Sequence, residues 1–152
     1  MTDLSDQFAE QRSNIIQLDG SPTYGLFEFD EIPLHMELTF IAAKTSPVQG
    51  IRLRMTGGNL EVNGEQSSEV VLWEDTAPKV VNVDVRADDR ARNTTLKLWN
   101  VWRGGMDVTQ AWLGNAAIQV DGDPSSGSFR FRCSDGQGEP NFDDLVVQVH
   151  IL

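Results

Sequence analysis

Apolar and polar residues alternate with a period of two along most of the chain. The clearest runs are 36–43, 51–56, 81–86, 129–133 and 145–151, in which every second residue is apolar. Successive side chains of a β-strand point to opposite faces, so this alternation predicts strands with one buried face and one solvated face. Such strands are typical of antiparallel sheets.

Turn-forming motifs separate these runs. They combine glycine, proline, asparagine and aspartate, which favour tight turns, and they include Asp19-Gly20-Ser21-Pro22, Thr56-Gly57-Gly58-Asn59, Arg103-Gly104-Gly105, Asp121-Gly122-Asp123-Pro124 and Asp135-Gly136. About eleven strands follow one another with no long helical pattern between them. We therefore predict an all-β protein, an antiparallel two-sheet β-sandwich of jelly-roll type, in preference to a closed barrel.

One motif predicts a particular hairpin. Asn63-Gly64 is a dipeptide that tight two-residue turns prefer, and it lies between the strand-like runs 60–62 and 69–73. We expect these two runs to pair, with a loose connection between them.

The N-terminal segment, residues 1–21, departs from the β pattern. Apolar residues recur within it at spacings of four and seven, which is the spacing of one face of a helix. Thr2 or Asp3 is a suitable N-cap, whereas the β-branched pair Ile15-Ile16 favours a strand. We expect a short helix that caps one end of the sandwich, within a single domain of residues 1–152.

Composition constrains the partners and the compartment. The chain has 23 acidic and 12 basic residues and a net charge of −11, which opposes binding to nucleic acids and to anionic membranes. Its single cysteine, Cys133, excludes an intrachain disulfide. No apolar run approaches the roughly 20 residues that span a bilayer, and the N-terminus is unlike a secretory signal. We expect a soluble, cytoplasmic protein that binds neither nucleic acid nor membrane.

The segment 96–118 holds three of the four tryptophans. In an extended strand over 94–102, one face would carry Leu96, Leu98, Asn100 and Trp102, and the other Lys97, Trp99, Val101 and Arg103. Both faces are largely apolar, so the strand must be covered on two sides. The second cover is the N-terminal segment, a long loop, a bound ligand or a second subunit.

Tryptophan rings beside amide and guanidinium groups are typical of surfaces that bind sugars, peptides or another subunit. The candidate ligand-binding residues are Trp99, Trp102, Arg103, Gln110, Trp112 and Asn115. The competing interpretation is that the rings fill the core, which is where large aromatic side chains are commonly found. Solvent exposure of the tryptophans distinguishes the two.

A second candidate is the acidic stretch 134–144. It combines two glycines with four carboxylates, which belong to Asp135, Glu139, Asp143 and Asp144. Oxygen ligands on a flexible loop suit calcium, although the spacing is not that of the helix-flanked calcium loop. Calcium at these residues is the one cofactor that the sequence suggests. The alternative is a solvated turn whose aspartates bond to their own backbone.

Two pairs of arginines are expected to point away from the core, Arg52 with Arg54 and Arg130 with Arg132. If their strands are neighbours, four guanidinium groups form an anion-binding face. The alternative is pairing across strands with acidic residues, the partners being Glu37, Glu61, Glu69 or Asp84.

No catalytic set is recognisable, and we predict that the protein is not an enzyme. The histidines His35 and His150, together with Cys133, give at most three nitrogen and sulfur ligands for a zinc site. Cys133 shares a strand face with two phenylalanines, so we expect a buried, inert thiol. The chain has no nucleophile elbow and no phosphate-binding glycine loop.

Three functions remain, in order of preference. The first is a non-catalytic binding or assembly domain that presents a tryptophan-bearing face to a carbohydrate or a peptide. The second is a homo-oligomeric structural protein, a homodimer in which the covered strand meets its symmetry mate. The third is a carboxylate-based hydrolase that uses the loops at 121–123 and 135–144.

Overall fold

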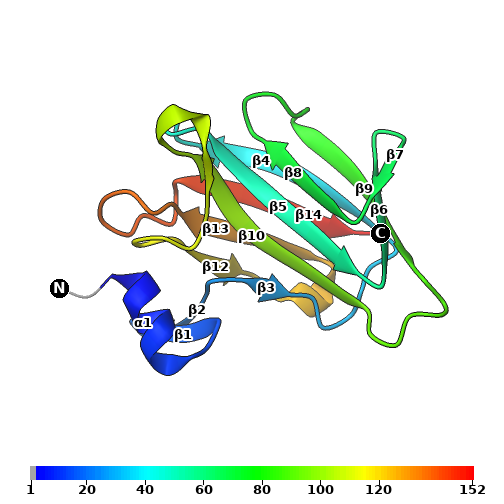
Figure 1. The fold of residues 1–152 in the computed structure, drawn as a ribbon, viewed down its shortest axis with the longest axis horizontal. Coiled ribbons are helices and arrows are strands. Elements are labelled where there is room, and N and C mark those ends of the chain that lie inside the picture. Colours follow the sequence, from blue (N-terminus) through cyan, green and yellow to red (C-terminus); the bar gives the residue numbers. More distant parts are fainter. Residues whose placement is uncertain (1–2) are drawn as a thin grey trace.

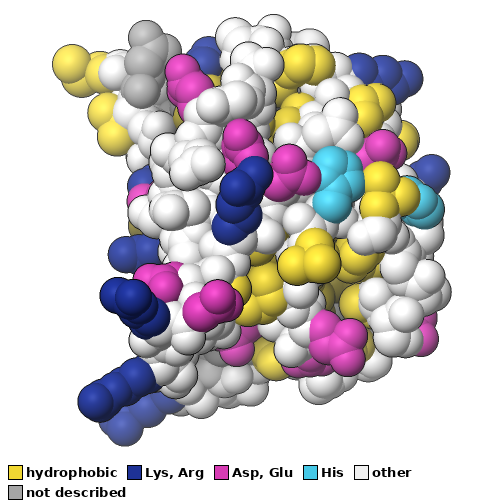
Figure 2. Space-filling model, turned by 90° about the vertical axis from the view of Figure 1, so that its right-hand side faces the viewer, with side chains coloured by type: hydrophobic (Ala, Val, Ile, Leu, Met, Phe, Trp, Pro, Cys, Tyr) yellow, Lys and Arg dark blue, Asp and Glu magenta, His cyan; other side chains and the backbone are white. Residues whose placement is uncertain are grey.

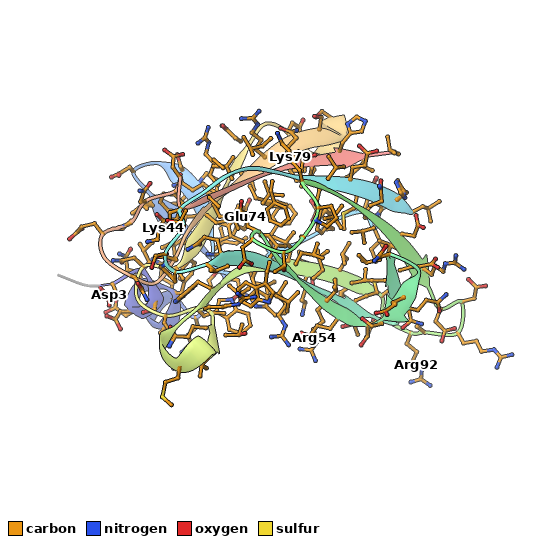
Figure 3. The ribbon with its side chains drawn as sticks, turned by 90° about the horizontal axis from the view of Figure 1, so that it is seen from above. Asp3, Lys44, Arg54, Glu74, Lys79 and Arg92 are labelled. Atoms are coloured by element: carbon orange, nitrogen blue, oxygen red, sulfur yellow. The ribbon has the colours of Figure 1, made fainter. Side chains whose placement is uncertain are left out.

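The computed structural model contains two antiparallel β-sheets and one short helix at the N-terminal end (Figure 1). It describes residues 3–152, apart from the side chain of Asp107. Seen from above, the sheets form two layers with side chains between them (Figure 3). The predicted all-β, two-sheet antiparallel class is therefore confirmed.

The larger sheet has nine strands in the order β1-β2-β12-β13-β14-β4-β9-β6-β7. Their bounds are β1 (Ile15–Leu18), β2 (Ser21–Tyr24), β12 (Ala117–Asp121), β13 (Ser128–Ser134), β14 (Leu145–Ile151), β4 (His35–Ala43), β9 (Val80–Ala87), β6 (Gly58–Val62) and β7 (Glu65–Ser67). Four of the five alternating runs in the sequence lie in this sheet, as β4, β9, β13 and β14.

The smaller sheet has the order β11-β10-β5-β8. Its strands are β11 (Thr109–Gln110), β10 (Thr95–Arg103), β5 (Gln49–Thr56) and β8 (Glu69–Trp73), and a short strand β3 (Phe27–Glu28) also pairs with β10. Two 3-10 turns lie in the connections, η1 (Gly105–Asp107) and η2 (Pro124–Ser126).

The core lies between the sheets and is built from the alternating residues. Ile51 and Leu53 of β5 are fully buried, and Asn100 and Leu98 lie opposite them in register on β10. Cys133 is fully buried as well, and burial raises the pKa of its thiol. The prediction that Cys133 is buried is confirmed.

The Asn63-Gly64 turn corrects one prediction. These residues have φ values of 54° and 80°, which fits a two-residue turn with both central residues left-handed. The turn pairs β6 directly with β7, with Val62 opposite Glu65. The expected pairing with 69–73 is wrong because the tight turn needs no loose connection, and the run 69–73 is β8 in the other sheet.

The N-terminal segment forms a helix followed by a strand, as predicted. Helix α1 (Leu4–Gln11) begins after Asp3, whose side chain makes no capping hydrogen bond; Thr2 lies outside the described residues. Ile15-Ile16 opens β1, so the segment also adds an edge strand to the larger sheet. Among residues 3–152, no helix has the length and apolar character needed to traverse a bilayer.

Candidate binding site

Strand β10 is covered on both faces, as its sequence predicts. On the outer face, Trp99 and Val101 are only 4% and 0% exposed. Trp112, from the connection that follows β10, lies against Trp99 with ring centroids 4.9 Å apart and ring planes tilted by 31°. The sequence allowed four possible covers for the second face of this strand, and the structure shows that a long loop covers it.

Aromatic rings and guanidinium groups complete this outer layer. Trp73 lies over Gly50, where a Cβ atom would come within 2.7 Å of its ring. The Arg103 guanidinium lies 4.6 Å from the centroid of Trp73, and that of Arg52 lies 5.8 Å from the centroid of Trp99. Both distances fit cation–π attraction.

The connection between β10 and β12, residues 104–116, is named the Trp loop here. It exposes four large apolar side chains, with exposed fractions of 98% for Met106, 56% for Val108, 49% for Trp112 and 53% for Leu113. Scattered apolar side chains are ordinary on a protein surface, so the concentration of four on one loop makes this loop the candidate site.

Two of these side chains stand on strained backbone. Met106 and Trp112 have φ values of 59° and 58°, a left-handed conformation that bulky residues seldom adopt. Such a residue costs on the order of 1 kcal/mol, and strain of this kind is often found at functional sites. The loop therefore holds these two side chains in place at an energetic cost.

Trp112 also forms one wall of a groove of about 500 Å³ against α1. The other walls combine apolar residues with polar ones; the lining contains Phe8, Ala9, Leu26 and Ala116 together with Ser5, Arg12, Ser13 and Asn14. The ring of Trp112 is fixed because its Nε1 donates to the carbonyl oxygen of Gly25 at 2.9 Å. The one polar atom of the ring is thus already engaged within the protein.

The polar residues beside the tryptophans are engaged too. Gln110 accepts a hydrogen bond through Oε1 from Nε1 of Trp102 at 3.0 Å. Arg103 donates from Nη1 to Oδ2 of Asp75 at 3.3 Å, in addition to stacking on Trp73. These groups hold the loop and the sheet together rather than facing an open site.

Asn115 connects three segments at the N-terminal end of the molecule. Its Oδ1 accepts from the backbone N–H of Leu4 in α1 at 3.1 Å, and its Nδ2 donates to the carbonyl of Gly138 at 2.7 Å. The neighbouring Gly114 carbonyl accepts from the N–H of Ser5 at 2.9 Å. Asn115 therefore fixes the Trp loop to the helix and to the acidic stretch.

The six predicted ligand-binding residues do not form one surface. Trp99 and Trp102 are 4% and 1% exposed, so their rings belong to the interior. Trp112 is the half-exposed ring of the set, and the remaining three, Arg103, Gln110 and Asn115, are partly buried and engaged.

The acidic stretch 134–144 turns two of its carboxylates inward. Asp135 and Asp144 are 0% and 3% exposed, whereas Glu139 and Asp143 face the solvent. The Nζ of Lys44 lies 2.8 Å from Oδ2 of Asp135 and 3.7 Å from Oδ1 of Asp144. Burial raises the pKa of the Asp144 carboxyl.

These four carboxylates do not fit a calcium ion. The ammonium group of Lys44 already lies at both buried carboxylates, and Asp143 pairs with Arg132 instead. In the part of the chain that the structure describes, no three histidine, cysteine, aspartate or glutamate residues are grouped for a metal. The alternative interpretation, a solvated turn whose aspartates bond to their own backbone, holds in part: the N–H of Asp135 donates to Asp144 at 3.1 Å and that of Gln137 to Asp135 at 2.9 Å, but both aspartates are buried.

The two arginine pairs lie on different sheets, Arg52 and Arg54 on β5 and Arg130 and Arg132 on β13. They therefore do not form one anion-binding face. Arg52 instead pairs across strands with Glu69, its Nε 2.7 Å from Oε1, as the alternative interpretation expects.

His35 is also engaged within the sheet. Its Nδ1 is hydrogen-bonded to the carboxylate of Asp84 on the adjacent strand β9, which raises the pKa of the imidazole. Figure 2 looks onto this side of the molecule, where histidine, acidic and hydrophobic side chains are interspersed. The one cysteine is buried in the core, away from this surface.

Sequence reasoning did not find the groove beside Trp112, because its walls come from α1, from residues 25–26 and from the Trp loop. The available signal was the concentration of large apolar residues between the glycines of that loop.

Comparisons with protein-family models, with curated proteins and with solved structures give no match. The fold and the site together define a two-sheet β-protein with an apolar, tryptophan-bearing surface loop.

Proposed function

We propose that the protein is a non-catalytic binding domain that recognises a protein or peptide partner through the Trp loop. The observation that carries this proposal is the exposure of Met106, Val108, Trp112 and Leu113 on one loop. Tryptophan and methionine are enriched in protein interfaces, and a tryptophan beside a pocket is a common binding hot spot.

The surroundings of Trp112 favour a peptide over a carbohydrate. A sugar ring that stacks on tryptophan carries hydroxyl groups, which need hydrogen-bond partners beside the ring. Nε1 of Trp112 and the side chains of Gln110 and Asn115 are all engaged within the protein. The apolar part of the groove against α1 instead suits an apolar side chain of a partner.

A second copy of the chain is a particular case of a protein partner. Sedimentation at micromolar concentration separates the two cases. A dimer that dissociates in Trp112→Ala assigns the loop to self-association, and a monomer assigns it to a different protein.

Other properties of the proposal come from the sequence pattern. The net charge of −11 supports a soluble protein that binds neither nucleic acid nor anionic membrane, and the single cysteine fits the proposed cytoplasmic location. The strand spacing supports one domain over residues 1–152 and a jelly-roll arrangement within the two-sheet fold. No catalytic activity is part of the proposal.

Selection of peptides from a random displayed library against the folded protein tests the proposed function. We expect selected peptides to share an apolar or aromatic anchor, and Trp112→Ala to weaken their binding about 30-fold, as for a hot spot worth about 2 kcal/mol. Trp112→Phe, which keeps an aromatic ring, should retain part of the affinity.

Leu34→Ala is the matched control, since Leu34 is 80% exposed but lies outside the Trp loop and the groove. Equal binding of the peptides to wild type and to Trp112→Ala contradicts the proposal. So does a glycan panel that shifts the tryptophan fluorescence while no peptide is selected.

A further inference from the structure

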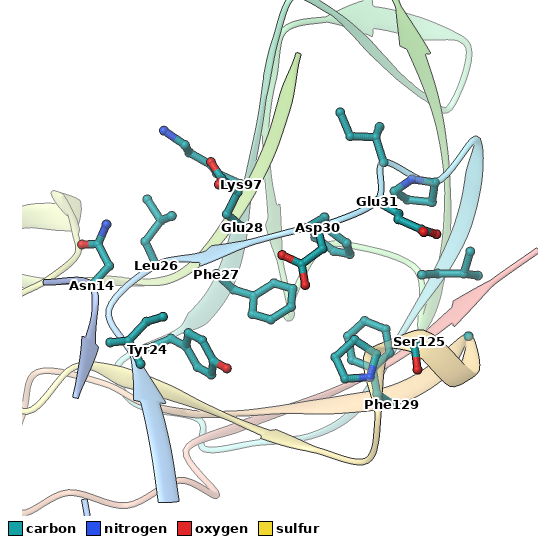
Figure 4. A pocket seen from close by; sticks show the side chains of 17 residues that line it. Asn14, Tyr24, Leu26, Phe27, Glu28, Asp30, Glu31, Lys97, Ser125 and Phe129 are labelled. Carbon is teal, nitrogen blue, oxygen red and sulfur yellow. The ribbon is translucent and has the colours of Figure 1, made fainter. Parts of the chain in front are cut away.

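A second and larger cavity, of about 1030 Å³, lies beside β3 and η2. Its lining comes mainly from residues 24–33 and 124–129, two stretches far apart in the sequence. Figure 4 shows the side chains of Tyr24, Phe27 and Phe129 around this space. The cavity shares Leu26 and Asn14 with the groove beside Trp112 but is otherwise lined by different residues.

Aromatic rings form the floor of this cavity. Four aromatic residues belong to the lining: the ring of Phe27 lies 5.4 Å from that of Tyr24 and 5.2 Å from that of Phe29, and Phe29 lies 6.5 Å from Phe129 (centroid distances). Phe27, Phe29 and Phe129 are at most 7% exposed, so the core holds these rings and they present little surface to the cavity, whereas the ring of Tyr24 is partly exposed. Ring faces carry negative electrostatic potential and attract cations.

Two carboxylates stand at the rim. Asp30 and Glu31 are exposed residues of the cavity lining, and the carboxylate of Asp30 points into the cavity beside the ring of Phe27 (Figure 4). Within residues 3–152, the structure assigns no ion pair or side-chain hydrogen bond to Asp30, Glu31 or the Tyr24 hydroxyl. Their charge and polarity therefore remain available to a ligand.

The basic residue of the lining does not neutralise this rim. Lys97 lies opposite Glu28 in register on the paired strands β10 and β3. Both side chains point away from the space between Phe27 and Phe129 (Figure 4). The cavity thus combines an aromatic floor with two unpaired negative charges.

We infer that this cavity binds an organic cation, an ammonium or guanidinium group carried on an apolar body. The partly exposed ring of Tyr24 accepts the face of the cation, the apolar residues of the lining accept its hydrocarbon part, and the carboxylates of Asp30 and Glu31 complement its charge. An inorganic metal ion is a poor match, because the described residues hold no group of three histidine, cysteine, aspartate or glutamate side chains placed to bind one. This site goes beyond the proposed function and rests on different side chains from those of the Trp loop.

Titration of the whole protein with choline tests this inference, monitored by NMR and by calorimetry. The control ligand is 3,3-dimethylbutan-1-ol, which has the same shape without the charge. We expect choline to shift the resonances of Tyr24 and Phe27 and the uncharged alcohol to bind at least about fivefold more weakly. Trp112→Ala should leave choline binding unchanged, so failure here is distinguishable from failure of the proposed function.

Two carboxylate variants provide the matched comparison. Asp30→Asn should weaken choline about fivefold, whereas Glu28→Gln, on the same segment but pointing away, should not. Both positions are exposed, so both variants should fold. Equal affinity for choline and the alcohol, equal weakening by the two variants, or no shift at millimolar choline overturns the inference.

A further titration distinguishes the two possible sources of the cation, a basic side chain of a protein and a free amine. A glycine-flanked peptide with one arginine or one trimethyllysine is titrated beside choline. Tighter binding of the peptide assigns the cavity to a basic side chain of a protein, and tighter binding of choline assigns it to a free amine.

Discussion

The acidic stretch 134–144 and the Trp loop 104–116 lie against each other and reverse the usual distribution of side chains. Carboxylates of the acidic stretch are buried, with Asp135 and Asp144 at 0% and 3% exposure, while Met106 of the Trp loop is 98% exposed. The two loops touch closely, because a Cβ atom on Gly114 would lie 2.3 Å from the carbonyl oxygen of Gly136.

The two loops differ in whether other residues of the chain compensate their unusual side chains, the buried carboxylates of one and the exposed apolar groups of the other. The buried carboxylates are compensated within the chain by Lys44 and by Nε2 of Gln49, which donates to Asp135 at 2.9 Å. Buried charges need such partners to be stable. Across the described residues the exposed apolar side chains of the Trp loop have no comparable cover. The acidic stretch is therefore explained by stability, and the apolar side chains of the Trp loop are the surface that the proposed partner would cover.

Removal of Trp102, which lies beneath both loops, should have the largest effect on stability. Its ring is fully buried, and a Cβ atom on Gly136 would come within 2.5 Å of it. We expect Trp102→Ala to lower the free energy of unfolding by about 4 kcal/mol, measured by urea denaturation. A loss similar to that of Trp112→Ala would contradict the assignment of Trp102 to the core.

Asp135→Ala should have the next largest effect. It removes the nearer carboxylate partner of Lys44, which keeps only Asp144 at 3.7 Å, and one of the two acceptors of the Gln49 amide, so we expect a loss of about 3 kcal/mol in unfolding free energy. The matched control is Asp143→Ala, which removes an exposed partner of Arg132 and should cost less than about 1 kcal/mol. Equal losses would remove the distinction between the inward and outward carboxylates.

The stability difference between wild type and Asp144→Asn should depend on pH. Burial raises the pKa of Asp144 in the folded protein. The stabilising contribution of such a carboxyl is fully present below its ordinary value of 3.8 and is lost as pH rises through the folded value. The difference in unfolding free energy should therefore move in favour of the variant between acid and neutral pH. A difference that is constant, or that moves the other way, contradicts the assigned direction.

The exposed apolar residues should give the smallest effects on stability. Met106→Ala and Val108→Ala remove side chains that are 98% and 56% exposed, so the unfolding free energy should change by no more than about 0.5 kcal/mol. Their affinity for the selected peptides should nevertheless fall. Substantial destabilisation would show that these side chains serve the fold instead.

The period-two pattern predicted the strands well because a strand's burial follows directly from its own residues. It placed β4, β5, β9, β13 and β14, and it showed that β10 is covered on both faces. The pattern could not show that Trp112 is the cover, because that contact depends on how the loop folds back. Nor could it show that Lys44 reaches the carboxylates of Asp135 and Asp144 from another connection.

Amide hydrogen exchange of the protein, with and without a peptide selected against it, tests most directly whether the Trp loop is the binding surface. The peptide should slow exchange in residues 104–116 and in helix α1, which together with residues 25–26 line the groove beside Trp112. Protection confined to other segments, with these two unchanged, would contradict the proposed role of the loop.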